Sequence, residues 1–463
     1  MTMKRLEFST IEEVGALLRS AELSSVAVTT LMLERIKRLD SRLNAFITVL
    51  TDQALEQAQR ADSELASGYD RGPLHGIPIA IKDLIATEGV LTTGGSKYYE
   101  AWIPDYDAAA VSSLSAAGAV ILGKTGLHEL AFGSTSINPY YGAISNPWML
   151  DHHPGGSSGG SAVAVAVGMA YAALGTDTGC SVRQPAQCCG IVGYKPTFGL
   201  VSKEGVLPLV PSMDHVGSLA RSVRDVALVL HAIQGTGADD PDLISRDASS
   251  YSAQVQWPLD GATVGVPRQF FFSGGDPEVV GLVDCALMTF EKLGAKLVDI
   301  DIPDIESAYK AADVTFSEIE QVYGEALVDN PGAFSEPFRR RFAGVTRCSV
   351  EDYAVAQEFR EKFRMTVGDV LSRCDILAMP TSTVSAAPIA GQPGDHDVER
   401  RKNCCIFNFT GHPAISIPCG ITAAGLPVGM MLAGPMSEDA TVLRFAHLFE
   451  ENTSWHLQHP DLD

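Results

Sequence analysis

The chain has 463 residues, of which 46% are hydrophobic, and its formal net charge is −22. This length and apolar content are sufficient for a large buried core, and large α/β proteins often form a single domain of this size. Nucleic-acid phosphates require a basic surface, so the acidic balance argues against a nucleic-acid partner. Solubility is the simpler explanation of the charge.

The N-terminal segment, residues 1–70, is predicted to form a helical wrap. Residues 11–65 combine helical periodicity with many charges, and Glu13 stands three positions after Thr10, the spacing of a capping box. No apolar run of signal-peptide length precedes these helices. The longest weakly polar run, 161–174, is too short to cross a bilayer and is predicted as a buried helix. We therefore expect a cytoplasmic protein that does not bind membranes.

Short apolar strands alternate with helices over residues 74–232. The run 77–81 leads into Lys82, and a second run, 119–122, leads into a Gly-Lys-Thr sequence. Such runs bounded by glycine are typical of buried strands. Residues 118–125 therefore match the letters of a phosphate-binding loop but place a strand where the loop would be, and we expect no nucleotide cofactor.

Two glycine-rich turns, 154–161 and 175–186, carry the most informative serines. Ser157 lies in the first turn and Ser181 in the second. A serine hydroxyl is a weak nucleophile that needs a base within hydrogen-bond reach. A lysine on a buried strand can be that base, because burial disfavours the charged ammonium. Lys82 is therefore the candidate base.

Histidine, the usual base, is absent from residues 154–186. His152 and His153 precede the first turn and could in principle reach back toward the serines. An adjacent pair before a proline is more typical of a loop surface. We therefore expect both histidines to lie on the surface and outside the catalytic machinery.

These motifs resemble the amidase signature family of Ser-Ser-Lys amide hydrolases. Three later segments, 375–381, 409–418 and 425–430, are similar to the same family, so the resemblance extends over most of the chain. It implies an α/β/α fold in which helices flank a central mixed β-sheet. It also implies cleavage of a C–N acyl bond through a serine acyl-enzyme, without a metal or an organic cofactor.

The resemblance also assigns a role to each candidate residue. It implies that Ser181 is the nucleophile, that Lys82 is the base, and that Ser157 is a bridging serine on a cis peptide. Ser158 is expected to be a structural neighbour in the same turn. Successive backbone N–H groups can converge on one developing negative charge. The expected oxyanion hole consists of the N–H groups of Thr178, Gly179, Cys180 and Ser181.

Cys180 departs from the family pattern, which usually has glycine before the second serine. Glycine would permit a positive φ and a close approach to the substrate, and cysteine permits neither freely. We expect activity to survive with an altered pocket shape, although Cys180 could itself be a nucleophile or a redox-active thiol. Asp177 and Arg183 flank the same loop and are expected to pair across it to hold its shape.

We expect a single domain over residues 1–463, with a signature core at 71–235 and a surface crossing at 235–258. Charged helices are expected at 307–372, and the resemblance implies that they form a roof over the substrate site. Further elements are predicted at 264–266 (strand), 277–293 (helix) and 296–300 (strand). Aromatic side chains that could line the pocket are Tyr140, Tyr141, Phe270, Phe271, Phe272 and Phe316.

The expected partner is a small-molecule amide, aryl or alkyl, with a carbamate (urethane) plausible and an ester as an easier side substrate. Two other functions stay open: the transamidase component of a tRNA-dependent amidotransferase, and a non-catalytic binding protein that retains the fold. A homodimer also stays open. The nine cysteines include two adjacent pairs, which are typical of reduced thiols rather than of a disulfide framework or a metal site.

Overall fold

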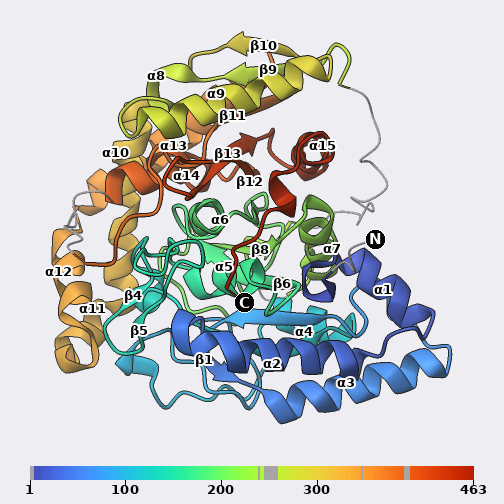
Figure 1. The fold of residues 1–463 in the computed structure, drawn as a ribbon. Helices are drawn as coiled ribbons and strands as arrows, with labels where there is room; N and C mark the ends of the chain where they lie inside the picture. Colours follow the sequence, from blue (N-terminus) through green and yellow to red (C-terminus); the bar gives the residue numbers. More distant parts are fainter. Residues whose placement is uncertain (1–4, 238–239, 245–258, 346–347, 391–396, 463) are drawn as a thin grey trace.

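The fold is built on one mixed sheet of 11 strands, flanked by helices (Figure 1). The computed structural model describes residues 5–237, 240–244, 259–345, 348–390 and 397–462. The strands are β1 (Phe46–Val49), β2 (Pro78–Lys82), β3 (Val120–Thr125), β4 (Ile137–Asn138), β5 (Gly142–Ala143), β6 (Ala172–Asp177), β7 (Val192–Lys195), β8 (His215–Ala220), β9 (Thr263–Val266), β10 (Lys296–Asp299), β11 (Ile376–Pro380), β12 (Ala414–Ile421) and β13 (Pro427–Ala433). The order in the large sheet is β1-β3-β2-β6-β8-β7-β12-β13-β11-β9-β10. This confirms the expected α/β architecture with a central mixed sheet.

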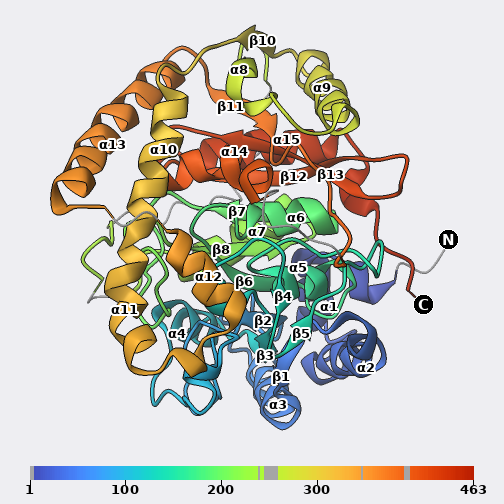
Figure 2. The same cartoon turned by 90° about the vertical axis from the view of Figure 1, so that its left-hand side faces the viewer.

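The helices lie around this sheet (Figure 2), and in places several of them follow one another between two strands. They are α1 (Ile11–Arg19), α2 (Ser25–Leu43), α3 (Thr51–Ala66), α4 (Ala109–Ala116), α5 (Gly159–Ala166), α6 (Arg183–Cys189), α7 (Val223–Ile233), α8 (Arg268–Phe271), α9 (Pro277–Lys292), α10 (Ile305–Thr315), α11 (Ile319–Asp329), α12 (Glu336–Gly344), α13 (Val350–Leu371), α14 (Asp397–Phe409) and α15 (Asp439–Glu451).

The N-terminal helices begin as the sequence predicts. Thr10 accepts a hydrogen bond from the Glu13 N–H at 3.2 Å and donates its own N–H to the Glu13 carboxylate at 2.9 Å, so the capping box of α1 is present. The helical wrap also contains a strand that was not predicted, because β1 pairs antiparallel with β3 at one edge of the sheet. A strand of four residues between charged helices leaves too little period-two pattern to be recognised.

The turn that carries Ser181 lies where a strand of the sheet ends. Strands β3, β2 and β6 are parallel, and β6 continues into the turn that carries Ser181. The turn that carries Ser157 leads into α5. The predicted helix at 161–174 is correct only as far as Ala166, because Ala172 already begins β6. An alanine- and valine-rich run does not distinguish a buried helix from a buried strand.

Strand β7 joins the two halves of the sheet by pairing antiparallel with β12. In the second half, β9 and β10 run parallel, and α9 lies between them in the sequence, as predicted. The long hairpin of β12 and β13 packs against α6, which follows the serine turn. Most of the predicted surface crossing at 235–258 lies outside the described residues.

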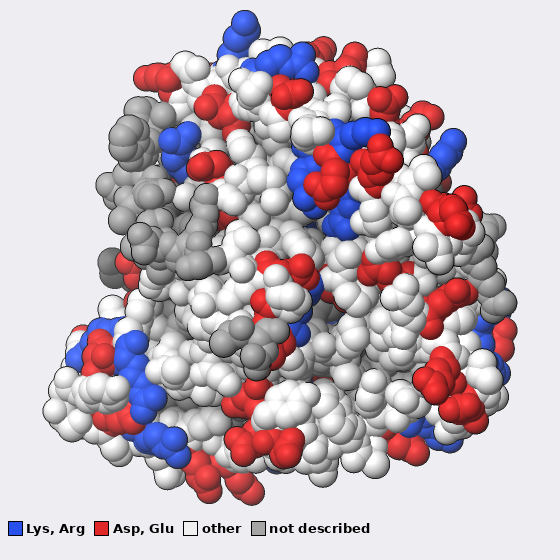
Figure 3. All heavy atoms as spheres, turned by 180° about the vertical axis from the view of Figure 1, so that it is seen from behind, with Lys and Arg blue, Asp and Glu red and all other residues white. Residues whose placement is uncertain are grey.

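Helices α10 to α13 occupy residues 305–371 and lie along one side of the molecule (Figure 2). The predicted charged helices are therefore present at this position. The division of the chain into one domain with a core and a roof stays a prediction. On the face in Figure 3, acidic and basic side chains are intermixed. In the described parts of the chain, no helix is long and apolar enough to cross a membrane.

Candidate active site

Lys82 lies at the C-terminal end of β2 and is fully buried. Its Nζ is 2.7 Å from Ser157 Oγ and 2.8 Å from Thr176 Oγ1. Burial lowers the pKa of Lys82 to about 7, although the charges of Asp177 and Asp214 oppose the shift. A large fraction of this lysine is therefore neutral near physiological pH and can accept a proton from a hydroxyl.

The first serine turn is held against the second by backbone contacts. The peptide bond between Gly156 and Ser157 is cis, as the resemblance implies. The Ser158 N–H donates to the Ser181 carbonyl at 3.1 Å. The Ser158 hydroxyl donates to the Thr176 carbonyl at 3.2 Å, which agrees with its expected structural position. The structure thus brings Lys82, Ser157 and the Ser181 loop together.

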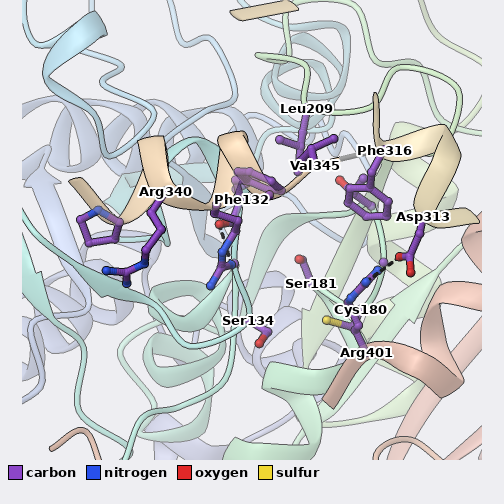
Figure 4. Close-up of a pocket in the computed structure, with 17 residues that line it drawn as sticks. Phe132, Ser134, Cys180, Ser181, Leu209, Asp313, Phe316, Arg340, Val345 and Arg401 are labelled. Carbon is purple, nitrogen blue, oxygen red and sulfur yellow. Dashed lines mark hydrogen bonds and ion pairs between the residues drawn. The ribbon is translucent and has the colours of Figure 1, made fainter. Parts of the chain in front are cut away.

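Ser181 and the loop before it line a pocket of about 680 Å³ (Figure 4). Ser181 is 5% exposed, whereas Ser157 is completely buried and is not among the residues that line the pocket. The other lining members of the loop are Thr178, Gly179 and Cys180, the residues expected to form the oxyanion hole. The Thr178 hydroxyl donates to Asp214 at 2.5 Å, which fixes the start of the loop.

Asp177 and Arg183 form the ion pair expected across the loop. The Arg183 Nη2 and Nε groups donate to the two carboxylate oxygens of Asp177 at 2.9 and 3.0 Å, and both side chains are fully buried. Burial raises the pKa of Asp177, but the neighbouring Arg183 charge and its hydrogen bonds more than offset this and hold the pKa well below its usual value. Asn408 on α14 also binds the Asp177 carboxylate, at 2.9 Å. The ion pair of Asp177 and Arg183 therefore holds the loop in its conformation.

Cys180 fits its position without the conformation that favours glycine. Its φ is not positive, so the cysteine side chain causes no backbone strain there. The Cys180 Sγ lies 3.8 Å from the Gly156 carbonyl oxygen and lines the pocket beside Ser181 (Figure 4). All nine cysteines lie in the described residues and carry free thiols.

The prediction for His153 is wrong, because this side chain is fully buried rather than on the surface. Its Nδ1 accepts a hydrogen bond from the Gly155 N–H at 3.0 Å, so the ring supports the first serine turn. His152 is partly exposed and contacts Asp151, as expected of a loop residue. Neither histidine is among the residues that line the pocket.

Sequence reasoning missed the side chains that surround Ser181 from other elements. Three arginines line the pocket, Arg340 and Arg341 on α12 and Arg401 on α14, together with Asp313 on α10. Of the six aromatic candidates, Phe316 lines the pocket. These residues do not belong to a motif within one short segment, because they come from separate elements of the second half of the chain. Thr176 could have been found from its place next to Asp177.

Comparison with known proteins identifies the class that this site defines. A model of the Amidase family matches residues 27–443. The chain therefore belongs to the amidase family, the amidase signature enzymes whose motifs it carries, and is an amidase-type hydrolase.

Individual proteins are similar along nearly the whole chain. The A subunit of glutamyl-tRNA(Gln) amidotransferase from Aromatoleum aromaticum is 39% identical over 98% of this chain and 99% of its own length. A solved inhibitor-bound complex, described as vestigial and as revealing the origins of an s-triazine catabolic enzyme, has a TM-score of 0.91 at 32% identity, covering 96% of this chain and 99% of that one. The peptide amidase PAM, solved with the competitive inhibitor chymostatin, has a TM-score of 0.87 at 30% identity, covering 98% and 99%.

The expectation that excluded a nucleic-acid partner is wrong. The Aromatoleum aromaticum relative is named as a subunit of an amidotransferase of glutamyl-tRNA(Gln) and matches 98% of this chain. The exclusion relied on the net charge of −22, but net charge describes the whole chain and not one surface. A protein that works within an assembly can also leave the phosphate contacts to another chain. The expectation of a stand-alone enzyme with only a small-molecule partner is wrong for the same reason.

Proposed function

We propose that this chain is the amide-cleaving component of a tRNA-dependent amidotransferase. The observation that carries the amide chemistry is the distance of 2.7 Å between Lys82 Nζ and Ser157 Oγ, in a turn whose Ser158 N–H is hydrogen-bonded to the Ser181 carbonyl. The role within an assembly is supported by the similarity along nearly the whole chain to a protein of that name. In this proposal an assembly of different chains takes the place of the homodimer that the sequence left open.

In this proposal Ser181 Oγ attacks the carbonyl carbon of the amide while its proton passes through Ser157 to neutral Lys82. The negative charge that forms on the carbonyl oxygen is stabilised by backbone N–H groups of the 178–181 loop. The C–N bond then breaks, and the proton returns through Ser157 to the leaving nitrogen. Water cleaves the acyl-enzyme by the same route, which releases the acid and restores Ser181.

The class of small-molecule substrate and the location stay predictions. An aryl amide or a carbamate would undergo the same acylation at Ser181, but the names of the relatives favour transamidation. A non-catalytic role would leave the contact between Lys82 and Ser157 without a purpose. A cytoplasmic location is compatible with a tRNA-dependent reaction.

The catalytic roles can be tested by labelling and turnover. A fluorophosphonate probe should label Ser181 in the wild-type protein, as mapped by mass spectrometry of the adduct. Ser181→Ala should abolish labelling and ammonia release while the thermal melt stays unchanged. Ser157→Ala and Lys82→Ala should each be crippling, and their combination should be little worse than the poorer single variant, because the residues act as one unit. Wild-type rates in Ser181→Ala would contradict the assignment.

The role within an assembly needs a separate experiment. The full chain should co-purify with other subunits when it is expressed with the genes of an amidotransferase, and the assembly should convert glutamyl-tRNA(Gln) to the amidated product. Ser181→Ala in the same assembly should bind its partners but form no product from an amide donor, and added ammonia should restore amidation. Ammonia release by a chain that binds neither other subunits nor tRNA would instead identify an amidase that works alone.

A further inference from the structure

The pocket around Ser181 is positively charged although the whole chain is strongly acidic. Its lining contains Arg340, Arg341 and Arg401 against a single aspartate, Asp313, while the chain as a whole has a net charge of −22. A local cluster of one sign in a cleft raises the concentration of oppositely charged ligands there. The positive charge therefore comes from the residues that line the pocket and does not follow from the net charge of the chain.

The Arg401 side chain is held by an ion pair and by two aromatic rings. Its Nη2 donates to Asp313 at 2.6 Å, and its guanidinium lies over the rings of Tyr309 and Phe316, each at 5.2 Å. The Arg401 side chain is 22% exposed, so part of it faces the pocket. A fixed guanidinium of this kind matches the planar, two-oxygen geometry of a carboxylate.

The Arg401 helix also lies next to the loop that is expected to bind the oxyanion. Cys405, one turn further along α14, has its Sγ 3.9 Å from the point where a Cβ on Gly179 would stand. Figure 4 shows Ser181 between Arg340 on one side and the Arg401–Asp313 pair on the other. Arg401 and Ser181 thus line the same pocket, so one ligand in it can contact both residues.

Asp313 also limits which charged groups a ligand in this pocket can carry. Among the described residues that line the pocket it is the only acidic one, and it is already bound to Arg401. A ligand ammonium would therefore have to share this carboxylate with Arg401 in a pocket that contains three arginines. The positive charges of the three arginines would also repel an ammonium group, so this group is disfavoured in the ligand.

We propose that the amide donor of this site is a short anionic amide, the mono-amide of a dicarboxylic acid without an ammonium group, whose carboxylate is bound by Arg401. This inference rests on the proposed amide-cleaving function and adds the class of donor. It distinguishes succinamate and glutaramate from their neutral isosteres, butanamide and pentanamide. It also distinguishes them from asparagine and glutamine, which have the same chain length but carry an ammonium.

Turnover tests the proposal in the wild-type full chain. Ammonia release from succinamate or glutaramate should have a kcat/KM about 10- to 100-fold above that for the neutral isostere and for the amino-acid amide, the scale of one charge-assisted hydrogen-bonded pair. Equal or higher values for butanamide and pentanamide, or for asparagine and glutamine, would overturn the donor class. Because this comparison uses the wild type, it does not depend on the folding of any variant.

Two variants locate the effect. Arg401→Gln should reduce the preference for succinamate over butanamide to within a few fold, and Arg401→Lys should retain part of it. Lys402→Gln is the matched control, because it removes the same charge one residue away, where Lys402 contacts Ser273 and Phe270 instead of the pocket. An equal loss of preference in Arg401→Gln and Lys402→Gln would overturn the assignment to Arg401.

Binding separates this inference from the function on which it rests. Isothermal titration of Ser181→Ala with the same amides requires no turnover, and succinamate should bind more tightly than butanamide and asparagine. Preferential binding without ammonia release by the wild type would refute the proposed function and leave the ligand class standing. Ammonia release from all amides at equal rates, with equal binding, would refute the ligand class and leave the function standing.

Discussion

The properties of Lys82 depend on burial more than on its neighbours. The side chain is completely enclosed, and its two close polar partners, Ser157 and Thr176, are uncharged hydroxyls. The carboxylates of Asp177 and Asp214 raise its pKa, but desolvation lowers the pKa by more than these charges raise it. The same lysine on the surface would be charged at every pH at which the protein works, and it could not accept a proton.

The rate of acylation should follow the ionisation of Lys82. Because its pKa is lowered to about 7, the neutral form decreases roughly tenfold for each pH unit below that value, and the rate should fall in parallel. Above about pH 8 we expect a plateau. The measurement is the second-order rate of fluorophosphonate labelling of Ser181 between pH 5 and pH 9, with circular dichroism as the control for folding. A flat profile across this range would exclude Lys82 as the base.

Cys180 should shape the pocket without taking part in the bond changes. Cys180→Ala should behave like the wild type, and Cys180→Gly should mainly change the relative rates of bulky and small acyl groups. A methylene-sized change in a pocket alters discrimination by about 10- to 200-fold, which sets the scale of the expected shift. The measurement is kcat/KM for a series of amides with acyl groups of increasing size.

Catalysis by the Cys180 thiol makes the opposite prediction. Both substitutions would then inactivate the enzyme, and iodoacetamide would inactivate the wild type in step with modification of Cys180. Observing both results would transfer the role of nucleophile from Ser181 to the thiol.

At the scale of elements, α5 sets the position of the first serine turn. Gly160 in its first turn approaches backbone atoms of the neighbouring segments, and a Cβ there would lie 2.4 Å from the Ala45 carbonyl oxygen and 2.5 Å from the Gly126 carbonyl oxygen. No side chain can be placed at that position unless the helix moves. Ser157 and Ser158, directly before the helix, would move with it.

Gly160→Ala should therefore lower both stability and activity. We expect a loss of about 1 to 3 kcal/mol in the free energy of unfolding, the range of overpacked positions, measured by urea denaturation. The control is Gly281→Ala in α9, where no atom lies within 4 Å of the added Cβ. That change should stabilise the protein by roughly 0.5 to 1 kcal/mol, because alanine favours the helix. Equal effects of the two substitutions would contradict the close packing of α5.

At the scale of the whole molecule, the sheet depends on both halves of the chain. Strand β7 pairs with β12 through Ala414, Ile415 and Ser416, more than two hundred residues later. Arg401 and Asp313 reach the pocket from the second half, and Ser181 comes from the first. The pocket therefore combines the Ser181 loop with side chains from the second half of the chain, and it depends on the sheet that joins the two halves.

A fragment containing residues 1–235 should therefore not fold to a stable monomer. It would expose the β7 edge and the apolar face of α6 that packs against β12 and β13. We expect aggregation in gel filtration and a non-cooperative urea transition, whereas the full chain should show one cooperative transition. A monomeric, cooperatively unfolding fragment would show that the signature core is a domain of its own.

The sequence by itself identified the candidate residues of the site. Lys82, Ser157 and Ser181 were selected from local patterns, an apolar strand that ends in lysine and two glycine-rich turns, and the structure places the three segments together. The ion pair of Asp177 and Arg183 was expected for the same reason, since both residues belong to one loop. Residues close in sequence have few ways to be arranged, so local rules suffice for them.

Only the tertiary structure decided which side chains line the pocket beside Ser181. The Arg401–Asp313 pair joins two helices that are far apart in the sequence, and neither residue belongs to a recognisable motif. The burial of His153 and the edge strand β1 were missed for a related reason, because both depend on packing against segments elsewhere in the chain. The candidate catalytic residues can therefore be predicted from short-range patterns, whereas the lining of the pocket depends on long-range contacts that the folded chain alone creates.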